Sequence, residues 1–217
     1  MDINNQTKYW NRVAKNKIFT HPIDTSLLLK YVSKEDRIID YGCGYGRIVK
    51  ELTENNFTNV TGFDTSNEII ERGCRDGVVK LFHFNDIATF PVENNSVDCI
   101  LLFAVLTCIP SNQAQIKLIN TLYSKLKSNG IIYISDYYLQ DDSTEVKQYE
   151  YFDGDLNNFG TFALPEGVTF RHHAKEWIAE LIKEFEIRES AMIDVTTMNG
   201  NSAKAFQLIV QKSINLV

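Results

Sequence analysis

Apolar segments of strand length alternate with segments of helix length along most of this 217-residue chain, and this alternation is the strongest constraint on its fold. Six segments have the composition of strands: residues 37–41, 59–64, 78–84, 96–105, 131–135 and 205–211. The fourth is apolar on both faces, as is typical of a strand that helices cover on both sides. The alternation predicts an α/β fold in which helices flank a mostly parallel sheet.

Helical spacing of apolar residues fills the gaps between these segments. We expect helices over 7–19, from Asp24 through Tyr31, after the glycine turn at 42–46, after Thr65, and over 111–126 and 174–185. His21-Pro22 ends the first, Asp24 caps the second, and Thr65 with Glu68 forms a capping box. The regular pattern is lost after residue 136. We predict a single domain over 1–217, with an N-terminal helical cap at 1–33 and a substrate-binding insertion or lid at 136–171.

Charge and composition exclude several classes of function. The chain has 22 Lys and Arg against 28 Asp and Glu, a net charge of −6, so a basic face for nucleic acid is not expected. No apolar run approaches the roughly 18–20 residues of a membrane span, and the first residues have no apolar signal core. The four cysteines form no C-x-x-C pair. We therefore predict a cytoplasmic protein that binds neither membranes nor nucleic acid.

The first strand runs into a glycine turn with the pattern D-x-G-x-G-x-G, from Asp40 to Gly46. Glycines let the backbone turn tightly and let a ligand approach the start of the next helix. The third glycine comes one residue earlier than in the dinucleotide fingerprint, and no G-K-[ST] of a P-loop follows. A carboxylate two residues before Gly42 is poorly suited to a pyrophosphate but suits a ligand that carries an ammonium group.

On these motifs, residues 36–212 resemble the class I S-adenosylmethionine-dependent methyltransferases. The resemblance implies a Rossmann-like, seven-stranded sheet whose last strand is antiparallel. It also implies that the turn holds the methionine part of the cofactor, that Asp64 binds the ribose hydroxyls, and that residues 85–87 contact adenine. The expected cofactor-binding residues are Tyr9, Trp10, Asp40, Gly42, Cys43, Gly44, Asp64, Thr65, Asn85, Asp86, Ile87 and Phe103. No metal site is expected.

The acceptor is predicted to be a small molecule methylated on N, O or C. Residues 103–106 lack the [DNS]-P-P-[YFW] of amino-directed DNA methyltransferases, and no Pro-Cys dipeptide offers a nucleophile for pyrimidine C5. The insertion is rich in rings that suit an aromatic pocket or a small core: Tyr137, Tyr138, Tyr149, Tyr151, Phe152, Phe159, Phe162 and Phe170. Its acids favour either a cationic acceptor or a solvated surface: Asp136, Asp141, Asp142, Glu145, Glu150, Asp153 and Asp155.

His172 and His173 are the candidate catalytic bases, because they lie where the insertion rejoins the scaffold. Neighbouring residues point in different directions, so at most one is expected to face the site, and a structural role for both is an equal alternative. Two other functions compete with a small-molecule methyltransferase: a protein or peptide methyltransferase, and a non-catalytic module that binds the cofactor.

Overall fold

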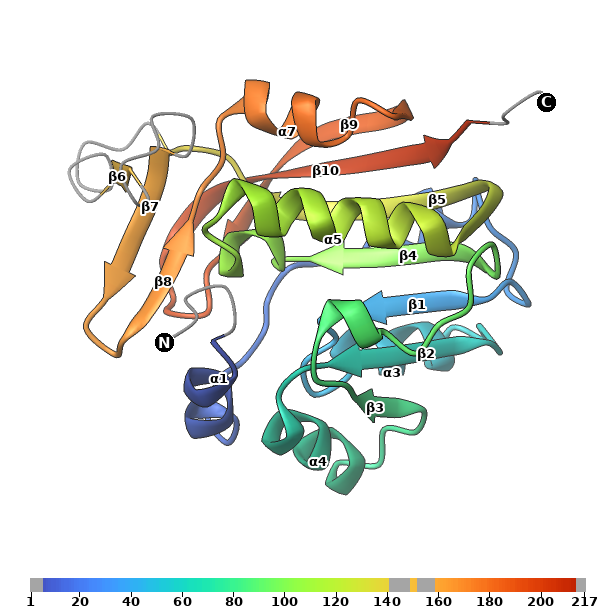
Figure 1. The fold of residues 1–217 in the computed structure, drawn as a ribbon. Coiled ribbons are helices and arrows are strands. Elements are labelled where there is room, and N and C mark those ends of the chain that lie inside the picture. The colour runs from blue at the N-terminus through green and yellow to red at the C-terminus, as the bar shows by residue number, and fades with distance from the viewer. Residues whose placement is uncertain (1–5, 141–148, 152–158, 214–217) are drawn as a thin grey trace.

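Seven strands form the main sheet of the protein (Figure 1). The structure, a computed structural model, describes residues 6–140, 149–151 and 159–213. In this part of the chain the strand order is β3-β2-β1-β4-β5-β10-β9. The strands are β1 (Ile38–Tyr41), β2 (Val60–Asp64), β3 (Leu81–His83), β4 (Val97–Phe103), β5 (Leu126–Tyr137), β9 (Phe185–Thr196) and β10 (Ser202–Lys212). Only β10 runs antiparallel to its neighbours, which confirms the predicted Rossmann-like sheet.

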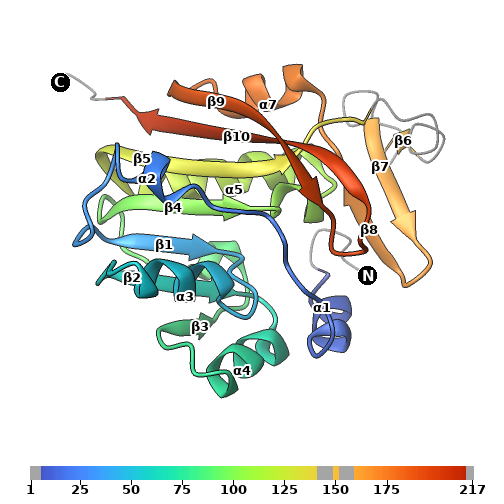
Figure 2. The ribbon, with the colours of Figure 1, turned by 180° about the vertical axis from the view of Figure 1, so that it is seen from behind.

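Helices cover both faces of this sheet, and the alternation of side chains along β4 shows how. Ile100 and Leu102 belong to a core under α5 (Asn112–Lys125) and α7 (Lys175–Leu181), which lie in front of the sheet in Figure 1. Cys99 and Leu101 point the other way, into a second core. That core lies under α2 (Thr25–Leu28), α3 (Arg47–Glu54) and α4 (Asn67–Arg75), and Figure 2 shows α2 and α3 on this face. A strand buried on both faces is expected to be apolar throughout, and this one is apolar at every position except Asp98 near its start.

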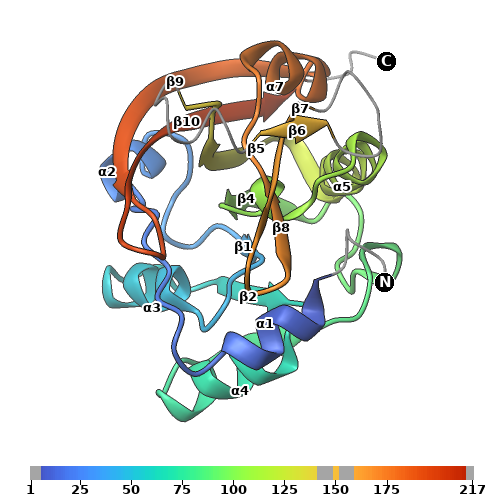
Figure 3. The ribbon, with the colours of Figure 1, turned by 90° about the vertical axis from the view of Figure 1, so that its left-hand side faces the viewer.

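The insertion contributes a separate antiparallel sheet of three strands, in the order β6-β7-β8. These are β6 (Glu150–Tyr151), β7 (Phe159–Leu164) and β8 (Val168–Arg171). Val168 and Phe170 of β8 pack with Tyr9 of α1 (Thr7–Val13) in a small apolar cluster. Figure 3 shows the β7–β8 hairpin and α1 on the side of the molecule toward which β1, β2 and β4 run.

Several predicted element bounds were wrong. The helix predicted over 7–19 ends at Val13, because Arg72 of α4 binds the carbonyls of Ala14 and Lys17, at 2.9 and 2.7 Å, which a continuing helix would use internally. The N-cap of α4 is Ser66 rather than Thr65, since the Ser66 hydroxyl accepts from the Ile69 N–H. The third strand and the last predicted helix are shorter than expected. Asp24 and Ser111 cap α2 and α5.

Strand β9 was not predicted at all. It lies at the edge of the sheet, and most of its side chains are exposed. Charged and apolar residues alternate along it without forming an apolar run, so the composition that identified the buried strands is missing. Because β9 was not predicted, the loop that joins β9 to β10 was not predicted either.

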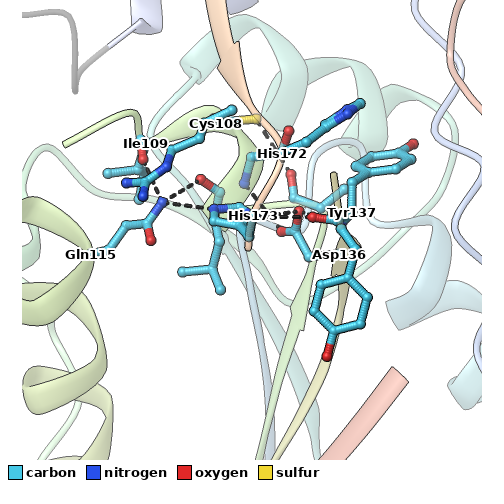
Figure 4. Close-up of polar contacts among 12 residues, drawn as sticks. Cys108, Ile109, Gln115, Asp136, Tyr137, His172 and His173 are labelled. Atoms are coloured by element: carbon cyan, nitrogen blue, oxygen red, sulfur yellow. Dashed lines mark hydrogen bonds and ion pairs between the residues drawn. The ribbon is translucent and has the colours of Figure 1, made fainter. Parts of the chain in front are cut away.

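A buried polar network fixes the turn that follows β4 (Figure 4). Gln115 of α5 is fully buried, and its Nε2 donates to the carbonyls of Leu106 (3.1 Å) and Ile109 (2.7 Å). The same nitrogen lies 2.9 Å from Nε2 of His173. From the other side, Asp136 at the end of β5 accepts from the N–H of Thr107 (3.2 Å). The turn, which contains the short helix η2 (Leu106–Cys108), is thus held by α5, β5 and the end of the insertion.

Replacing Gln115 by Ala is expected to lower the free energy of unfolding by about 3 kcal/mol, because it leaves buried carbonyls and the Trp177 indole N–H, 2.7 Å from Gln115 Oε1, without partners. Gln113 is an exposed residue of the same type on the same helix, and its change to Ala is expected to cost less than about 0.5 kcal/mol. Chemical denaturation of the two variants measures the difference. Equal losses in both would contradict the role given to the network.

Candidate functional site

A cavity of about 950 Å³ lies at the carboxyl ends of β1, β2 and β4. This is where ligands bind in open α/β sheets. Its floor is built by residues 40–43, by Asp64 and Thr65, and by Phe103 and the turn that follows it. Its roof comes from three segments far apart in sequence: residues 19–21, the β7–β8 hairpin and residues 197–202 of the β9–β10 loop. The cavity therefore combines the predicted motif residues with the insertion.

The glycine turn adopts a backbone that other residues rarely take. Gly42 and Gly44 have φ angles of 71° and 57°, in the left-handed region. A Cβ atom on Gly42 would lie 2.6 Å from the Val105 side chain, and one on Gly44 would lie 2.2 Å from the Phe19 ring. Gly42 and Cys43 line the cavity, whereas Gly44 does not, because Phe19 packs over it.

Asp40 has the chemistry expected of a site for an ammonium group. Its side chain lines the cavity, is 2% exposed, and within the described chain its Oδ2 has no hydrogen-bond partner. Burial raises the pKa of Asp40 to about 7, while the nearby Arg47 guanidinium lowers it. A buried carboxylate oxygen without a partner is costly, and a bound cation that donates to it removes that cost. Asp40 therefore fits the methionine ammonium of S-adenosylmethionine.

Asp64 is held in place by two backbone N–H groups. Gly44 N donates to its Oδ2 (2.9 Å) and Ser66 N donates to its Oδ1 (2.8 Å). These bonds lower the pKa of Asp64, but burial dominates and raises it. Each carboxylate oxygen accepts more than one hydrogen bond, so both still have room to accept from the hydroxyls of a ribose. Thr65, the next residue, also lines the cavity.

The residues predicted to contact adenine line the cavity together, beside the short helix η1 (Ile87–Thr89). Asp86 caps this helix by accepting from the Ala88 N–H (2.7 Å), and it lies 3.9 Å from the Lys117 ammonium. Asn85 is exposed and Ile87 is half-buried. Phe103 lines the same cavity at the end of β4.

The two aromatic residues of α1 have different surroundings. Trp10 lines the cavity and contacts the Phe19 ring edge-on at 6.0 Å. Tyr9 is 3% exposed, packs against Val168 and Phe170, and is not among the residues that line the cavity. Tyr9, predicted to bind the cofactor, thus packs in an apolar cluster outside the cavity.

The neighbouring histidines also differ, as Figure 4 shows. The ring of His172 lines the cavity, stacks on the Tyr137 ring at 5.0 Å, and has its Nδ1 2.6 Å from the Tyr149 hydroxyl. His173 is fully buried away from the cavity, with its Nδ1 3.1 Å from the Tyr137 carbonyl and its Nε2 beside Gln115. Burial lowers the pKa of both to about 3. His173 is therefore structural, and the prediction that it is catalytic is corrected.

Some residues of the insertion serve the cavity and others serve the fold. Tyr137, Phe162 and Phe170 line the cavity, whereas Tyr138 packs on Phe206 in the core. Asp136 is fully buried among backbone N–H donors, which corrects its assignment to an acidic surface. The remaining acids and rings that were named for the insertion have side chains that the structure does not describe. They are Asp141, Asp142, Glu145, Glu150, Tyr151, Phe152, Asp153 and Asp155.

Sequence reasoning missed several lining residues. Arg47 follows the third glycine directly, so its place at the site was available from the motif. His21 was interpreted only as part of a helix break. The β9–β10 loop was not predicted, because strand β9 was not predicted. Lys17 contacts this loop by donating to Asn199 Oδ1 (2.9 Å).

The described residues form neither a metal-binding cluster nor a membrane-spanning helix. They contain no group of three or more His, Cys, Asp or Glu that could hold a metal ion. Within the same residues, no helix has the length and apolar character needed to cross a membrane.

Comparisons with known proteins agree with this geometry. Residues 22–177 match the model of a family described as a methyltransferase domain. O-methyltransferase 3 of Dictyostelium discoideum is 30% identical over 119 residues, which are 50% of this chain and 27% of that protein. The tRNA N(3)-cytidine methyltransferase METTL2 of Gallus gallus is 30% identical over 112 residues, 46% of this chain and 30% of that protein. The chain thus spans less than a third of the length of these two relatives.

A solved structure shows the same fold. A SAM-dependent methyltransferase from Methanosarcina mazei superposes with a TM-score of 0.78 at 22% identity, covering 91% of this chain and 100% of that one. Because METTL2 is a tRNA methyltransferase, the relatives give no support to the sequence-based exclusion of nucleic acid. The matched family model covers most of the chain, and this protein belongs to the S-adenosylmethionine-dependent methyltransferase domains.

Proposed function

We propose that this protein transfers a methyl group from S-adenosylmethionine to an N, O or C atom of a small organic acceptor. The observation that carries the proposal is the lining of the cavity. It combines the cofactor-motif residues Asp40, Gly42 and Asp64 with aromatic rings from β5 and the β7–β8 hairpin, among them Tyr137 and Phe162. A volume of about 950 Å³ is within the range of sites that enclose small ligands.

The chain's own residues have three tasks in this reaction. Asp40 binds the ammonium end of the cofactor and Asp64 binds its ribose, so the reactive group is held at a fixed place. When bound, S-adenosylmethionine supplies a methyl group on a positively charged sulfur. The aromatic wall and the roof orient the acceptor and exclude water. Proximity of this kind supplies several kcal/mol of a reaction barrier.

His172 is proposed to bind the acceptor as a neutral imidazole. Burial lowers the pKa of His172 to about 3, which makes it a weak general base for an unreacted hydroxyl or amine. The acidity of an O–H or N–H rises sharply when its heavy atom gains a methyl group. A methylated hydroxyl is a strongly acidic oxonium, so for an oxygen acceptor a weak base in contact with that oxygen is sufficient to take the proton.

A nucleic-acid acceptor requires a positively charged surface, which the described cavity lining does not offer. Its basic residues are Arg47, which donates to the His21 carbonyl, and Lys117, which lies beside Asp86. Two basic residues, one of them engaged with the main chain and the other beside a carboxylate, do not form the basic face that a nucleic-acid backbone requires. A peptide acceptor would require an open groove, whereas segments from several distant parts of the chain line this cavity in addition to its floor.

Transfer of labelled methyl groups tests the function. The protein is incubated with methyl-labelled S-adenosylmethionine and, separately, with a metabolite extract, a protein extract and bulk tRNA. We expect label in the low-mass products of the metabolite extract. Changing His172 to Phe is expected to lower that transfer at least about tenfold, with unchanged affinity for S-adenosylhomocysteine. Label found only in protein or in tRNA would contradict a small-molecule acceptor.

The affinity for S-adenosylhomocysteine, which retains the ammonium group, is expected to rise with pH. A carboxyl group with a pKa of about 7 goes from about one tenth ionised at pH 6 to about nine tenths at pH 8, and only the charged form attracts the cation. Calorimetry should therefore show about tenfold tighter binding at pH 8. Changing Asp40 to Asn should weaken binding at pH 8 and remove this dependence. An unchanged pH profile in that variant would refute the assignment.

Changing Asp64 to Asn is expected to weaken S-adenosylhomocysteine binding about thirtyfold, or about 2 kcal/mol, because the amide accepts fewer and weaker hydrogen bonds from the ribose. Asp76, an exposed residue at the end of α4 outside the cavity, is the matched control. Its change to Asn should leave the affinity within about twofold. The same calorimetric titration serves both variants, and wild-type affinity in Asp64→Asn would remove Asp64 from the binding site.

A further inference from the structure

His21 is a buried cavity residue to which the proposed function gives no role. It lies in the extended segment between α1 and α2, is 4% exposed, and lines the cavity. Its Nδ1 lies 3.0 Å from the Ser135 hydroxyl, and Arg47 donates to its backbone carbonyl. The ring is therefore fixed through one nitrogen and through its own main chain.

The other ring nitrogen, Nε2, has no hydrogen-bond partner in the described chain. A buried polar atom left unpaired costs about 1–3 kcal/mol, and native proteins rarely keep one without a reason. Since the side chain lines the cavity, a ligand that enters the cavity is the available partner.

Tyr137 connects the His21 ring to the aromatic rings that are proposed to hold the acceptor. The edge of the His21 ring meets the Tyr137 ring at 4.7 Å and 82°, and the His172 ring stacks on the same tyrosine at 5.0 Å and 27°. Phe162 and Phe170 line the cavity from the β7–β8 hairpin. A flat ring suits such surroundings, because aromatic pairs add to the gain from burial.

The charged residues of the described cavity lining do not come from the segments that carry His21, Tyr137 and the rings of the hairpin. The charged lining residues are Asp40, Arg47, Asp64, Asp86 and Lys117, all on the elements that carry the cofactor motifs or on α5 beside them. Among the described residues, the polar groups of the roof and of the proposed acceptor part are uncharged. Burial and Arg47 lower the pKa of His21 to about 4, so this imidazole is also neutral at pH 7. A cationic acceptor would lose its hydration there without gaining a counter-ion.

We infer that His21 determines acceptor specificity: its Nε2 forms a hydrogen bond with the hydroxyl or ring N–H of an uncharged aromatic acceptor that lies against Tyr137. The inference rests on the proposed function and narrows its substrate class. The inference assigns His21 the tautomer in which Nδ1–H donates to the Ser135 hydroxyl. In this tautomer Nε2 presents a lone pair to an O–H or N–H donor.

Binding of three naphthalene probes to the protein saturated with S-adenosylhomocysteine tests the inference. The probes are 2-naphthol, 2-methoxynaphthalene, which lacks the O–H donor, and 2-(aminomethyl)naphthalene, which is a cation at pH 7. Calorimetry is expected to show that 2-naphthol binds about tenfold more tightly than each of the other two. Changing His21 to Phe should reduce the naphthol-to-methoxy preference to less than about threefold. Changing it to Gln, which keeps a hydrogen-bonding group, should retain part of it.

Ile18 is the matched control, because it lies in the same segment but is 62% exposed and is not among the lining residues. Its change to Ala should leave the preference unchanged. A preference that persists in His21→Phe, or a cation that binds more tightly than 2-naphthol, would overturn the inference. Binding of S-adenosylhomocysteine is measured first in every variant. If the wild type does not bind it, the proposed function itself fails, whereas normal binding with a preference independent of His21 refutes only the role of His21.

Discussion

The parallel register of β1 with its two neighbours is the constraint on which the site depends. Asp40 is paired with Gly62 of β2 and with Leu101 of β4, so all three strands end at the same edge of the sheet. The glycine turn, Asp64 and Phe103 follow those ends directly and meet in one cavity. Asp64 then joins two of the strands by accepting from the N–H of Gly44. Residues more than sixty positions apart in sequence thereby form one floor.

Buried polar groups have two distinct roles in this molecule. Gln115 and His173 have protein partners, and with Asp136 they hold the turn after β4 in place. Asp40 and His21 each keep one buried atom without a partner in the described chain, and both line the cavity. Desolvation changes the pKa of each titratable group here, lowering it for histidines and raising it for aspartates. Within the described residues the Tyr9 hydroxyl is also unpartnered but lies outside the cavity, so an unpaired buried atom points to ligand binding only where its residue lines the cavity.

Much of the floor of the site was predictable, because local sequence determines it. The order strand, D-x-G-x-G-x-G turn and helix needs only neighbouring residues, and Asp64 occupies the end of the next apolar strand. The roof was less predictable, since it depends on contacts between distant segments. His21 precedes a proline and looked like a helix break, and His172 could not be distinguished from His173 until the network around Gln115 was known. Strand β9 was missed because an exposed edge strand needs no apolar run.

The floor and the roof of the cavity are connected through Arg47, which contacts residues of both. Its guanidinium lies beside Asp40 at the start of α3 and donates to the carbonyl of His21 in the roof. The positive charge opposes both the protonation of Asp40 and the formation of an imidazolium at His21. One side chain thus favours a charged carboxylate where the cofactor's ammonium is expected and a neutral imidazole where the acceptor is expected. That combination suits a reaction between a cationic methyl donor and an uncharged acceptor, and it follows from a single residue after the glycine turn.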